Sequence, residues 1–201
     1  MRLGILASHE GTTLQAVLDG CASGVIPAKV ATIISNNSES GALRRARTAG
    51  LHWAHLSSRT HPDPKSLDLA ICQTLQQREV DFVLLAGYMR RLGPVTLQVF
   101  RGRVLNTHPA LLPKFGGQGM YGLRVHQAVL AAREATTGVS VHRVDAEYDA
   151  GPVIAQTVVQ VQADDTPETL AARVQQRERE FLVEVLAGLA TGRVELPAPG
   201  S

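Results

Sequence analysis

Short apolar runs alternate, along the first half of the chain, with longer segments whose apolar residues recur at helical spacing. Apolar runs of about four to eight residues between turn signals indicate buried strands, and helical spacing indicates helices that face a core. Strands are predicted at residues 3–7, 28–35, 52–56, 81–86 and 103–107. Helices are predicted between them, at residues 12–22, 41–49, 65–77 and 95–100. This alternation predicts an α/β fold with a parallel sheet and right-handed crossovers.

The pattern changes after residue 108. A glycine-rich loop at 114–122 leads into a predicted helix near 125–133, then strands at 137–144 and 153–161 and a long helix at 167–190. Residues 164–168 give that last helix a clear start, with a capping residue, Pro167 in the first turn and acidic side chains. We find no repeat and no linker, so residues 1–201 are expected to form one domain with a flexible tail at 193–201.

Composition narrows the function classes. The 201 residues include 20 basic and 18 acidic ones, which are mixed along the sequence. The resulting net charge of +2 does not favour binding to nucleic acid or membranes. Cys21 and Cys72 stand far apart, which argues against a metal site or a disulfide and favours reduced thiols. The first apolar run is too short for a signal peptide, and no segment approaches the roughly 20 apolar residues of a membrane span. We therefore expect a cytoplasmic protein.

Polar side chains with catalytic potential follow the fifth strand. Asn106 and His108 are two residues apart, so they point to the same face of a strand, and Pro109 keeps His108 extended. Asp149 follows about 40 residues later, in a turn-rich segment between the last two strands. An amide, an imidazole and a carboxylate can together stabilise a developing oxyanion and move a proton.

The loops after the first, fourth and fifth strands, residues 8–13, 87–92 and 108–122, should meet beyond the carboxyl ends of the strands, where open parallel sheets bind ligands. We expect residues 145–151 at that same edge. In the first loop, Gly-Thr-Thr at 11–13 leads into a helix, whose free amides make an anion site. The alternative is that Thr12 simply caps the helix.

Six motifs in this order resemble one family. They are Gly-Thr-Thr-Leu-Gln-Ala at 11–16, Ser-Asn at 35–36, Leu-Ala-Gly-Tyr-Met-Arg at 85–90, Asn-Thr-His-Pro-Ala-Leu-Leu-Pro at 106–113, Gly-Val-Ser-Val-His at 138–142 and Asp-Ala-Gly-Pro-Val-Ile at 149–154. Asn-x-His-Pro with Asp-x-Gly-Pro is typical of folate-dependent formyltransferases, and the Gly-Thr-Thr loop resembles the glycinamide ribonucleotide branch. The resemblance covers nearly the whole chain. It implies the formyltransferase fold, a Rossmann-like, mostly parallel twisted sheet with helices on both faces and an antiparallel C-terminal portion.

The resemblance also implies a reaction. The primary amine of glycinamide ribonucleotide would attack the formyl carbon of 10-formyltetrahydrofolate, the co-substrate, and no metal would be needed. Asn106 and His108, as imidazolium, would donate hydrogen bonds to the oxyanion. Asp149 would raise the pKa of His108 and so favour its charged form. His142 is left out of this set as a residue of the core.

By the same resemblance, residues 1–108 form a nucleotide-binding half and residues 109–192 a folate-binding and catalytic half. The ribonucleotide would contact Gly11, Thr12, Thr13, Gln175 and Glu178. The folate would contact Met89, Arg90, Arg91, Leu92, Asn106, Asp145, Ala146, Glu147 and Tyr148. Thr13 replaces an amide side chain usual in the family, Arg91 replaces an apolar one, and Pro64 stands where an arginine is common.

Other interpretations remain open at this stage. Gln175 and Glu178 also fit a solvated helix face, Asp149 fits a turn residue, and a lone histidine is more often structural. The loop at 115–122 could act as a lid. The rivals for function are another folate-dependent formyltransferase, a formyltetrahydrofolate hydrolase and a non-catalytic folate or nucleotide-binding protein. The expected partners are small-molecule substrates, with the protein a monomer or a homodimer.

Overall fold

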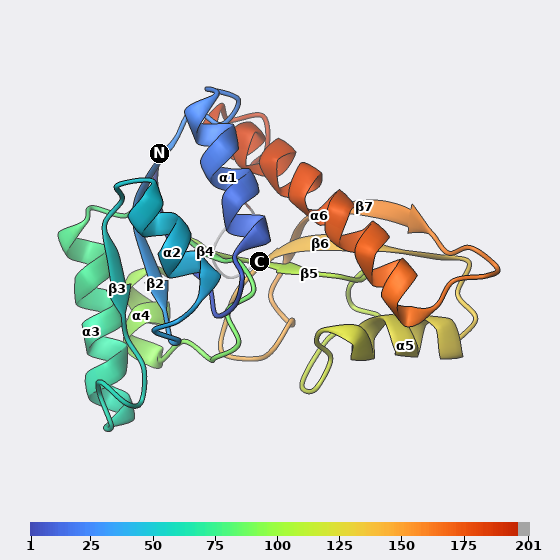
Figure 1. Cartoon of the computed structure of the whole chain (residues 1–201), viewed down its shortest axis with the longest axis horizontal. Helices are drawn as coiled ribbons and strands as arrows, with labels where there is room; N and C mark the ends of the chain where they lie inside the picture. Colours follow the sequence, from blue (N-terminus) through green and yellow to red (C-terminus); the bar gives the residue numbers. More distant parts are fainter. Residues whose placement is uncertain (197–201) are drawn as a thin grey trace.

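The computed structural model describes residues 1–196 and places seven strands in one sheet, in the order β3-β2-β1-β4-β5-β6-β7 (Figure 1). The strands are β1 (Arg2–Leu6), β2 (Lys29–Ser35), β3 (Trp53–His55), β4 (Phe82–Leu85), β5 (Val104–His108), β6 (Thr136–Arg143) and β7 (Val153–Gln160). The helices are α1 (Thr12–Ala22), α2 (Gly41–Thr48), α3 (Pro64–Gln77), α4 (Pro94–Val99), α5 (Leu123–Ala131) and α6 (Pro167–Ala190). Every predicted strand and helix is present, so the predicted element order is confirmed.

The first five strands are parallel, and the last two are not. β1 pairs with β2 and β4, β2 with β3, and β4 with β5, all in parallel. β6 runs antiparallel to β5, and β7 antiparallel to β6. The expected fold class, a mostly parallel sheet with an antiparallel C-terminal portion, is confirmed.

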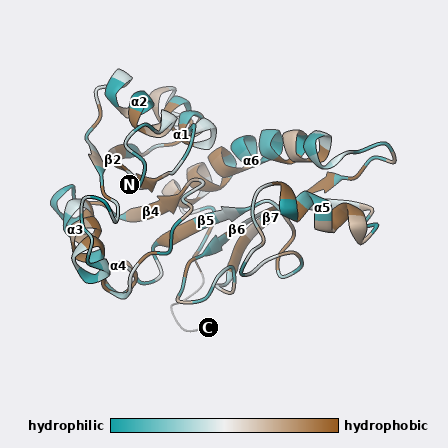
Figure 2. Ribbon diagram, turned by 60° about the horizontal axis from the view of Figure 1, so that its bottom comes forward, coloured by the Kyte–Doolittle hydropathy of each residue, from teal (hydrophilic) through white to brown (hydrophobic). Residues whose placement is uncertain are grey.

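Two hydrophobic cores fill the two faces of the sheet. One lies against α1, α2, α5 and α6 and includes Leu105, and the other lies against α3 and α4 and includes Val104. Figure 2 shows α1, α2 and α6 along one face, with α3 and α4 toward the other. Because adjacent strand residues point to opposite faces, the neighbours Val104 and Leu105 serve opposite cores. The same alternation decides where the polar residues at the end of β5 point.

Local signals explain two of the helix starts that frame the site. Thr166 is the N-cap of α6, where its hydroxyl accepts from the Thr169 amide and the Thr169 hydroxyl accepts in return from the Thr166 amide. The buried Asp68 of α3 accepts from the amides of Val95 and Thr96 and from the Thr96 hydroxyl. These bonds satisfy free amides in the first turn of α4 and fix that helix against α3.

Residues 145–151 reach the expected loops, although their connection starts from the opposite end of the sheet. Asp149 lies 3.4 Å from His108, the last residue of β5, and accepts from the Gly117 amide, and Tyr148 lies against Arg91. Arg143, the last residue of β6, pairs with Leu105 at the second position of β5, whereas His108 pairs with Ser140. The connection between β6 and β7 therefore leaves the sheet at the amino end of β5. The reversal of β6 is the cause, since an antiparallel strand ends where its parallel neighbour begins.

The chain beyond α6 turns back against the last turn of that helix. The backbone amides of Arg193 and Val194 both donate to the carbonyl of Gly188, and Leu196 packs against the larger core. Residues 197–201 of the expected flexible tail lie outside the described residues. No helix within residues 1–196 has the length and apolar character needed to cross a membrane.

Candidate functional site

The polar residues of β5 divide between the two faces of the sheet. Asn106 and His108 share the face of Val104, toward α3 and α4, while Thr107 shares the face of Leu105, toward α6. His108 is buried, with only 4% of its side chain exposed. The strand therefore presents an amide and an imidazole side by side, as the spacing in the sequence predicted.

Asp149 joins these residues from the connection between β6 and β7. One of its carboxylate oxygens lies 3.4 Å from Nδ1 of His108, and the other lies 3.4 Å from Nε2 of His142. The Asn106 side-chain nitrogen lies 3.1 Å from that same Nε2. The structure thus brings the three predicted catalytic residues into one network of contacts.

His142 is the member of this network that sequence reasoning missed. It is fully buried on β6, where it pairs directly with Asn106, and its Nδ1 donates to the carbonyl of Arg143 at 2.8 Å. The signal for it was present in the sequence. Ser140 and His142 alternate with valines in one strand, so that strand has a polar face, although its pairing with β5 cannot be read from spacing.

The electrostatics of His108 differ from the expectation. Burial lowers the pKa of the His108 imidazole below its ordinary value, and it outweighs the Asp149 carboxylate and the Phe115 carbonyl, which act in the opposite direction. The predicted rise in pKa is therefore wrong, because the cost of burying a charged ring exceeds the gain from one carboxylate. Nε2 lies 2.7 Å from the carbonyl oxygen of Phe115 and so carries the proton of the neutral ring.

Asp149 itself is held as a carboxylate. Burial acts to raise its pKa, but the His142 hydrogen bond, the charge of His108 and the Gly117 amide together lower it below its ordinary value. Asp149 has a positive φ of 53°, a conformation that Asp and Asn tolerate better than most residues. Two residues later, the backbone of Gly151 passes close to that of Arg143. A Cβ on Gly151 would overlap the Arg143 carbonyl oxygen, so this position requires glycine.

The glycine-rich loop also contacts the network. Its Gly117 amide donates to Asp149 at 3.0 Å, and its Phe115 carbonyl accepts from His108. The loop therefore lies against two of the three predicted catalytic residues. Its proposed role as a lid stays a prediction.

The predicted anion loop has the backbone geometry that such a site needs. Gly11 is the N-cap of α1 with a φ of 69°, and Thr12 and Thr13 open the helix. Because Gly11 has no side chain, the first amides of α1 receive no bond from a capping side chain, and Thr12 is not the cap. Exposed amides at a helix start attract anions.

Two predicted ribose-binding residues lie on α6. The Thr107 hydroxyl donates to Glu178 at 2.6 Å, which links β5 to this helix, and burial raises the pKa of Glu178 above its ordinary value. Gln175 is exposed one turn earlier. α1 and α6 both lie against the larger core, so both predicted ribonucleotide contacts belong to the same side of the sheet.

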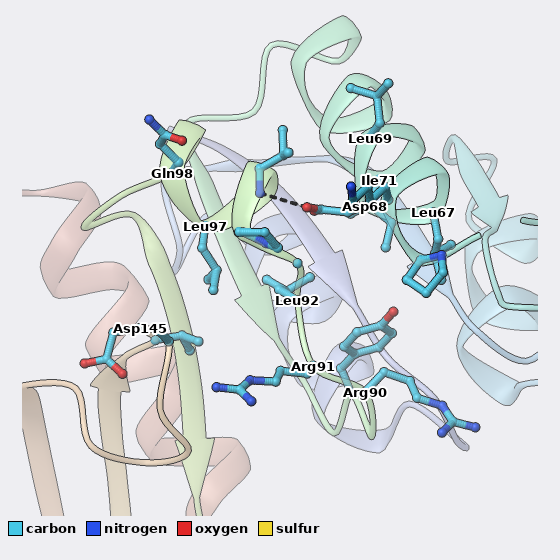
Figure 3. A pocket seen from close by; sticks show the side chains of 18 of the residues that line it. Leu67, Asp68, Leu69, Ile71, Arg90, Arg91, Leu92, Leu97, Gln98 and Asp145 are labelled. Atoms are coloured by element: carbon cyan, nitrogen blue, oxygen red, sulfur yellow. Dashed lines mark hydrogen bonds between the residues drawn. The ribbon is translucent and has the colours of Figure 1, made fainter. Parts of the chain in front are cut away.

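A cavity of about 1610 Å³ opens on the side of α3 and α4. Its lining includes five of the predicted folate residues, namely Arg90, Arg91, Leu92, Asp145 and Ala146. Leu92 and Leu97 give it apolar walls, and Figure 3 shows Arg91 reaching toward Asp145 while Arg90 points away from it. An apolar cavity with a few charged groups at its rim is typical of a site for a small organic molecule.

Three further predicted folate residues, Met89, Glu147 and Tyr148, are not part of the lining but lie next to it in the sequence. The Met89 amide donates to the hydroxyl of Ser8 at 2.8 Å, so the loops after β1 and β4 meet as predicted. The Arg91 guanidinium lies 5.3 Å from the ring centre of Tyr148, which joins the two predicted folate loops through a cation–π contact. Glu147 donates its amide to Asp145 at 3.0 Å. In the described part of the chain, no three His, Cys, Asp or Glu side chains gather in a way that could hold a metal ion.

Comparisons with known proteins agree with this geometry. A phosphoribosylglycinamide formyltransferase of Mycobacterium tuberculosis is 41% identical over 190 residues, which cover 94% of this chain and 85% of that protein. A chloroplastic phosphoribosylglycinamide formyltransferase of Arabidopsis thaliana is 36% identical over 96% of this chain and 67% of that protein. The crystal structure of glycinamide ribonucleotide transformylase 1 from Symbiobacterium toebii superimposes with a TM-score of 0.90 at 39% identity, over 99% of this chain and 92% of that one. The family model described as formyl transferase matches residues 1–186, so the chain belongs to the formyl transferase family.

Proposed function

We propose that this protein transfers the formyl group of 10-formyltetrahydrofolate to the primary amine of N1-(5-phospho-D-ribosyl)glycinamide, in purine biosynthesis. The products are the N-formyl ribonucleotide and tetrahydrofolate. The observation that carries the proposal is the contact network of Asn106, His108 and Asp149 in a chain of this family. Binding alone would not require a buried imidazole between a carboxylate and a carbonyl.

The first step forms a bond between the substrate amine and the formyl carbon, and a tetrahedral oxyanion develops. Asn106 donates one hydrogen bond to that oxygen from its amide. The Nε2 proton of His108 donates the second, with the formyl oxygen replacing the Phe115 carbonyl as its acceptor. A neutral imidazole can serve as this donor. Each such donor contributes about 10²–10³ in rate.

The second step moves a proton. The attacking nitrogen becomes cationic, and its proton passes through water toward Nδ1 of His108, where Asp149 stabilises the resulting imidazolium. The bond between the formyl carbon and N10 then breaks, and the proton goes to that leaving nitrogen. His108, with Asp149 beside it, therefore carries the proton from the attacking amine nitrogen to N10 of the folate.

We assign the two substrates to opposite sides of the sheet. The phosphate is assigned to the amides of Gly11, Thr12 and Thr13, and the ribose hydroxyls to Glu178 and Gln175. The folate is assigned to the cavity, with its pteridine between Leu92 and the segment of Asp145 and Ala146. On this assignment residues 1–108 supply the phosphate-binding loop and residues 109–192 supply Asp149 and the ribose contacts.

One experiment separates the candidate functions. The protein is incubated with a 10-formyl folate, with and without glycinamide ribonucleotide, and deformylated folate is followed spectroscopically. We expect turnover only when the amine is present. Turnover in water alone would favour a hydrolase, and binding of both ligands without turnover would favour a non-catalytic protein. Asp164→Asn, an exposed change at a residue outside the network, is the control for effects of substitution and purification alone.

A further inference from the structure

A row of polar residues crosses the antiparallel part of the sheet. His108 of β5 pairs with Ser140 of β6, and Ser140 pairs in turn with Gln156 of β7. Paired residues in a sheet point to the same face, so the three side chains lie on the face of the catalytic network. Gln156 is exposed on the outermost strand, two strands away from the histidine.

The amide of Gln156 is bonded through both of its hydrogens. Its Nε2 lies 2.9 Å from the carbonyl oxygen of Leu112 and 2.8 Å from the hydroxyl of Ser140. The carbonyl can only accept, which fixes the orientation of the Gln156 amide. The fully buried Ser140 hydroxyl also accepts from the Leu112 amide at 3.0 Å and donates to the Ala110 carbonyl at 2.6 Å.

These bonds fix the turn that follows His108. Ala110 and Leu112 lie two and four residues beyond the histidine, and both are held by Ser140 or Gln156. The same turn leads to Phe115, whose carbonyl accepts from Nε2 of His108. Displacement of the turn would therefore shift both the backbone next to His108 and the Phe115 carbonyl to which its ring is bonded. A buried hydrogen-bond network of this kind rigidifies its members when every polar group is satisfied.

We propose that Gln156 is a positioning residue for catalysis, which acts through Ser140 and Leu112 to hold His108 in the geometry that formyl transfer needs. This inference rests on the proposed function. Gln156 touches neither the imidazole nor the folate cavity, so its contribution falls on the rate of the chemical step and on the environment of His108. Substrate affinity depends on other residues.

The test replaces Gln156 by three side chains that differ in their ability to donate hydrogen bonds. Gln156→Met keeps the length and removes both donors, and we expect kcat to fall about tenfold with both KM values within about twofold, because small misplacements of reacting groups cost up to about 10² in rate. Gln156→Lys restores donors and should recover most of the rate. Gln156→Glu faces the Leu112 carbonyl with a carboxylate and should be at least as slow as the Met variant. Gln160→Met, on the same face of the same strand, is the matched control and should leave kcat unchanged.

A second measurement stays informative if the proposed reaction is not observed. The His108 ring is followed by NMR in protein carrying labelled histidine, as a function of pH. In Gln156→Met the turn loosens, water reaches the ring, and the pKa of His108 should rise toward its ordinary value. Unchanged titration and unchanged kcat in the Met variant would overturn the proposal. Absence of formyl transfer by the unsubstituted protein would overturn only the proposed function. A fall in thermal stability alone, with the His108 titration unchanged, would show a merely structural role.

Discussion

Replacement of Asp149 by asparagine removes one charge from the network and little else. Asparagine also tolerates the positive φ of this position, and its carbonyl can still accept from the Gly117 amide. The substitution therefore isolates the electrostatic effect of the carboxylate on His108.

The size of this effect follows from the geometry. A carboxylate 3.4 Å from a charged imidazole interacts with it by about 5 kcal/mol at an effective dielectric constant of about 20. Both side chains are nearly buried, at 4% and 11% exposed, so solvent screens the pair weakly. The asparagine dipole keeps part of the interaction, and a loss of about half gives about 2.5 kcal/mol, or roughly 10² in kcat.

The assay is single-turnover formyl transfer with saturating substrates, with Asp164→Asn as the control for an equal change in net charge. We expect the Asp149→Asn rate to fall by about 10², because the transition state carries the positive ring. The pKa of His108 should fall further, since burial already lowers it and the opposing carboxylate is gone. A rate within about threefold of the unsubstituted protein, or a His108 pKa that rises, would refute the coupling.

Three further outcomes are expected. His108→Ala should lower kcat by about 10²–10³ with little change in ribonucleotide Kd, as measured by titration calorimetry, and a large loss of affinity with normal turnover would assign His108 to binding instead. Asp68→Ala should lower the free energy of unfolding by about 2–4 kcal/mol in urea, because a buried carboxylate that caps α4 with three hydrogen bonds is removed; a loss under about 0.5 kcal/mol would contradict this. Burial lowers the pKa of both His108 and His126, so the unfolded chain takes up protons first and stability should fall as pH drops below about 6.5. Urea midpoints at pH 7.5 and 5.5 test the sign, and His126→Gln should reduce the difference.

The parallel half of the fold could be predicted because its strands are nearly continuous apolar runs. Such runs signal burial on both faces, and alternation with helices then leaves few topologies. The pair of Asn106 and His108 was predictable for a local reason, since two residues two apart in a strand share a face whatever the rest of the chain does. The free amides at the start of the first helix were predictable because Gly-Thr-Thr leads directly into a helical segment, and Gly11 is the N-cap of that helix.

The rest of the site depended on quantities that spacing does not contain. The side of the sheet from which Asp149 arrives depends on the direction of β6, and the sequence pattern of a strand is the same in both directions. The place of His142 opposite Asn106 depends on register. The direction of the His108 pKa shift depends on how deeply the ring is buried, and neighbouring charges alone predicted the opposite sign.

The conflict between burial and charge at His108 has a consequence for the proposed reaction. A ring that was already charged at rest would gain little from Asp149 during the reaction, because the favourable interaction would exist before the substrates react. A buried ring with a lowered pKa is neutral at rest, and the carboxylate at 3.4 Å stabilises it only when a proton arrives. Interactions that strengthen in the transition state accelerate the chemical step, whereas those equal in both states do not. Burial and Asp149 therefore have opposite effects on the charged His108 ring. Together they confine the stabilising interaction to the step in which the proton is transferred.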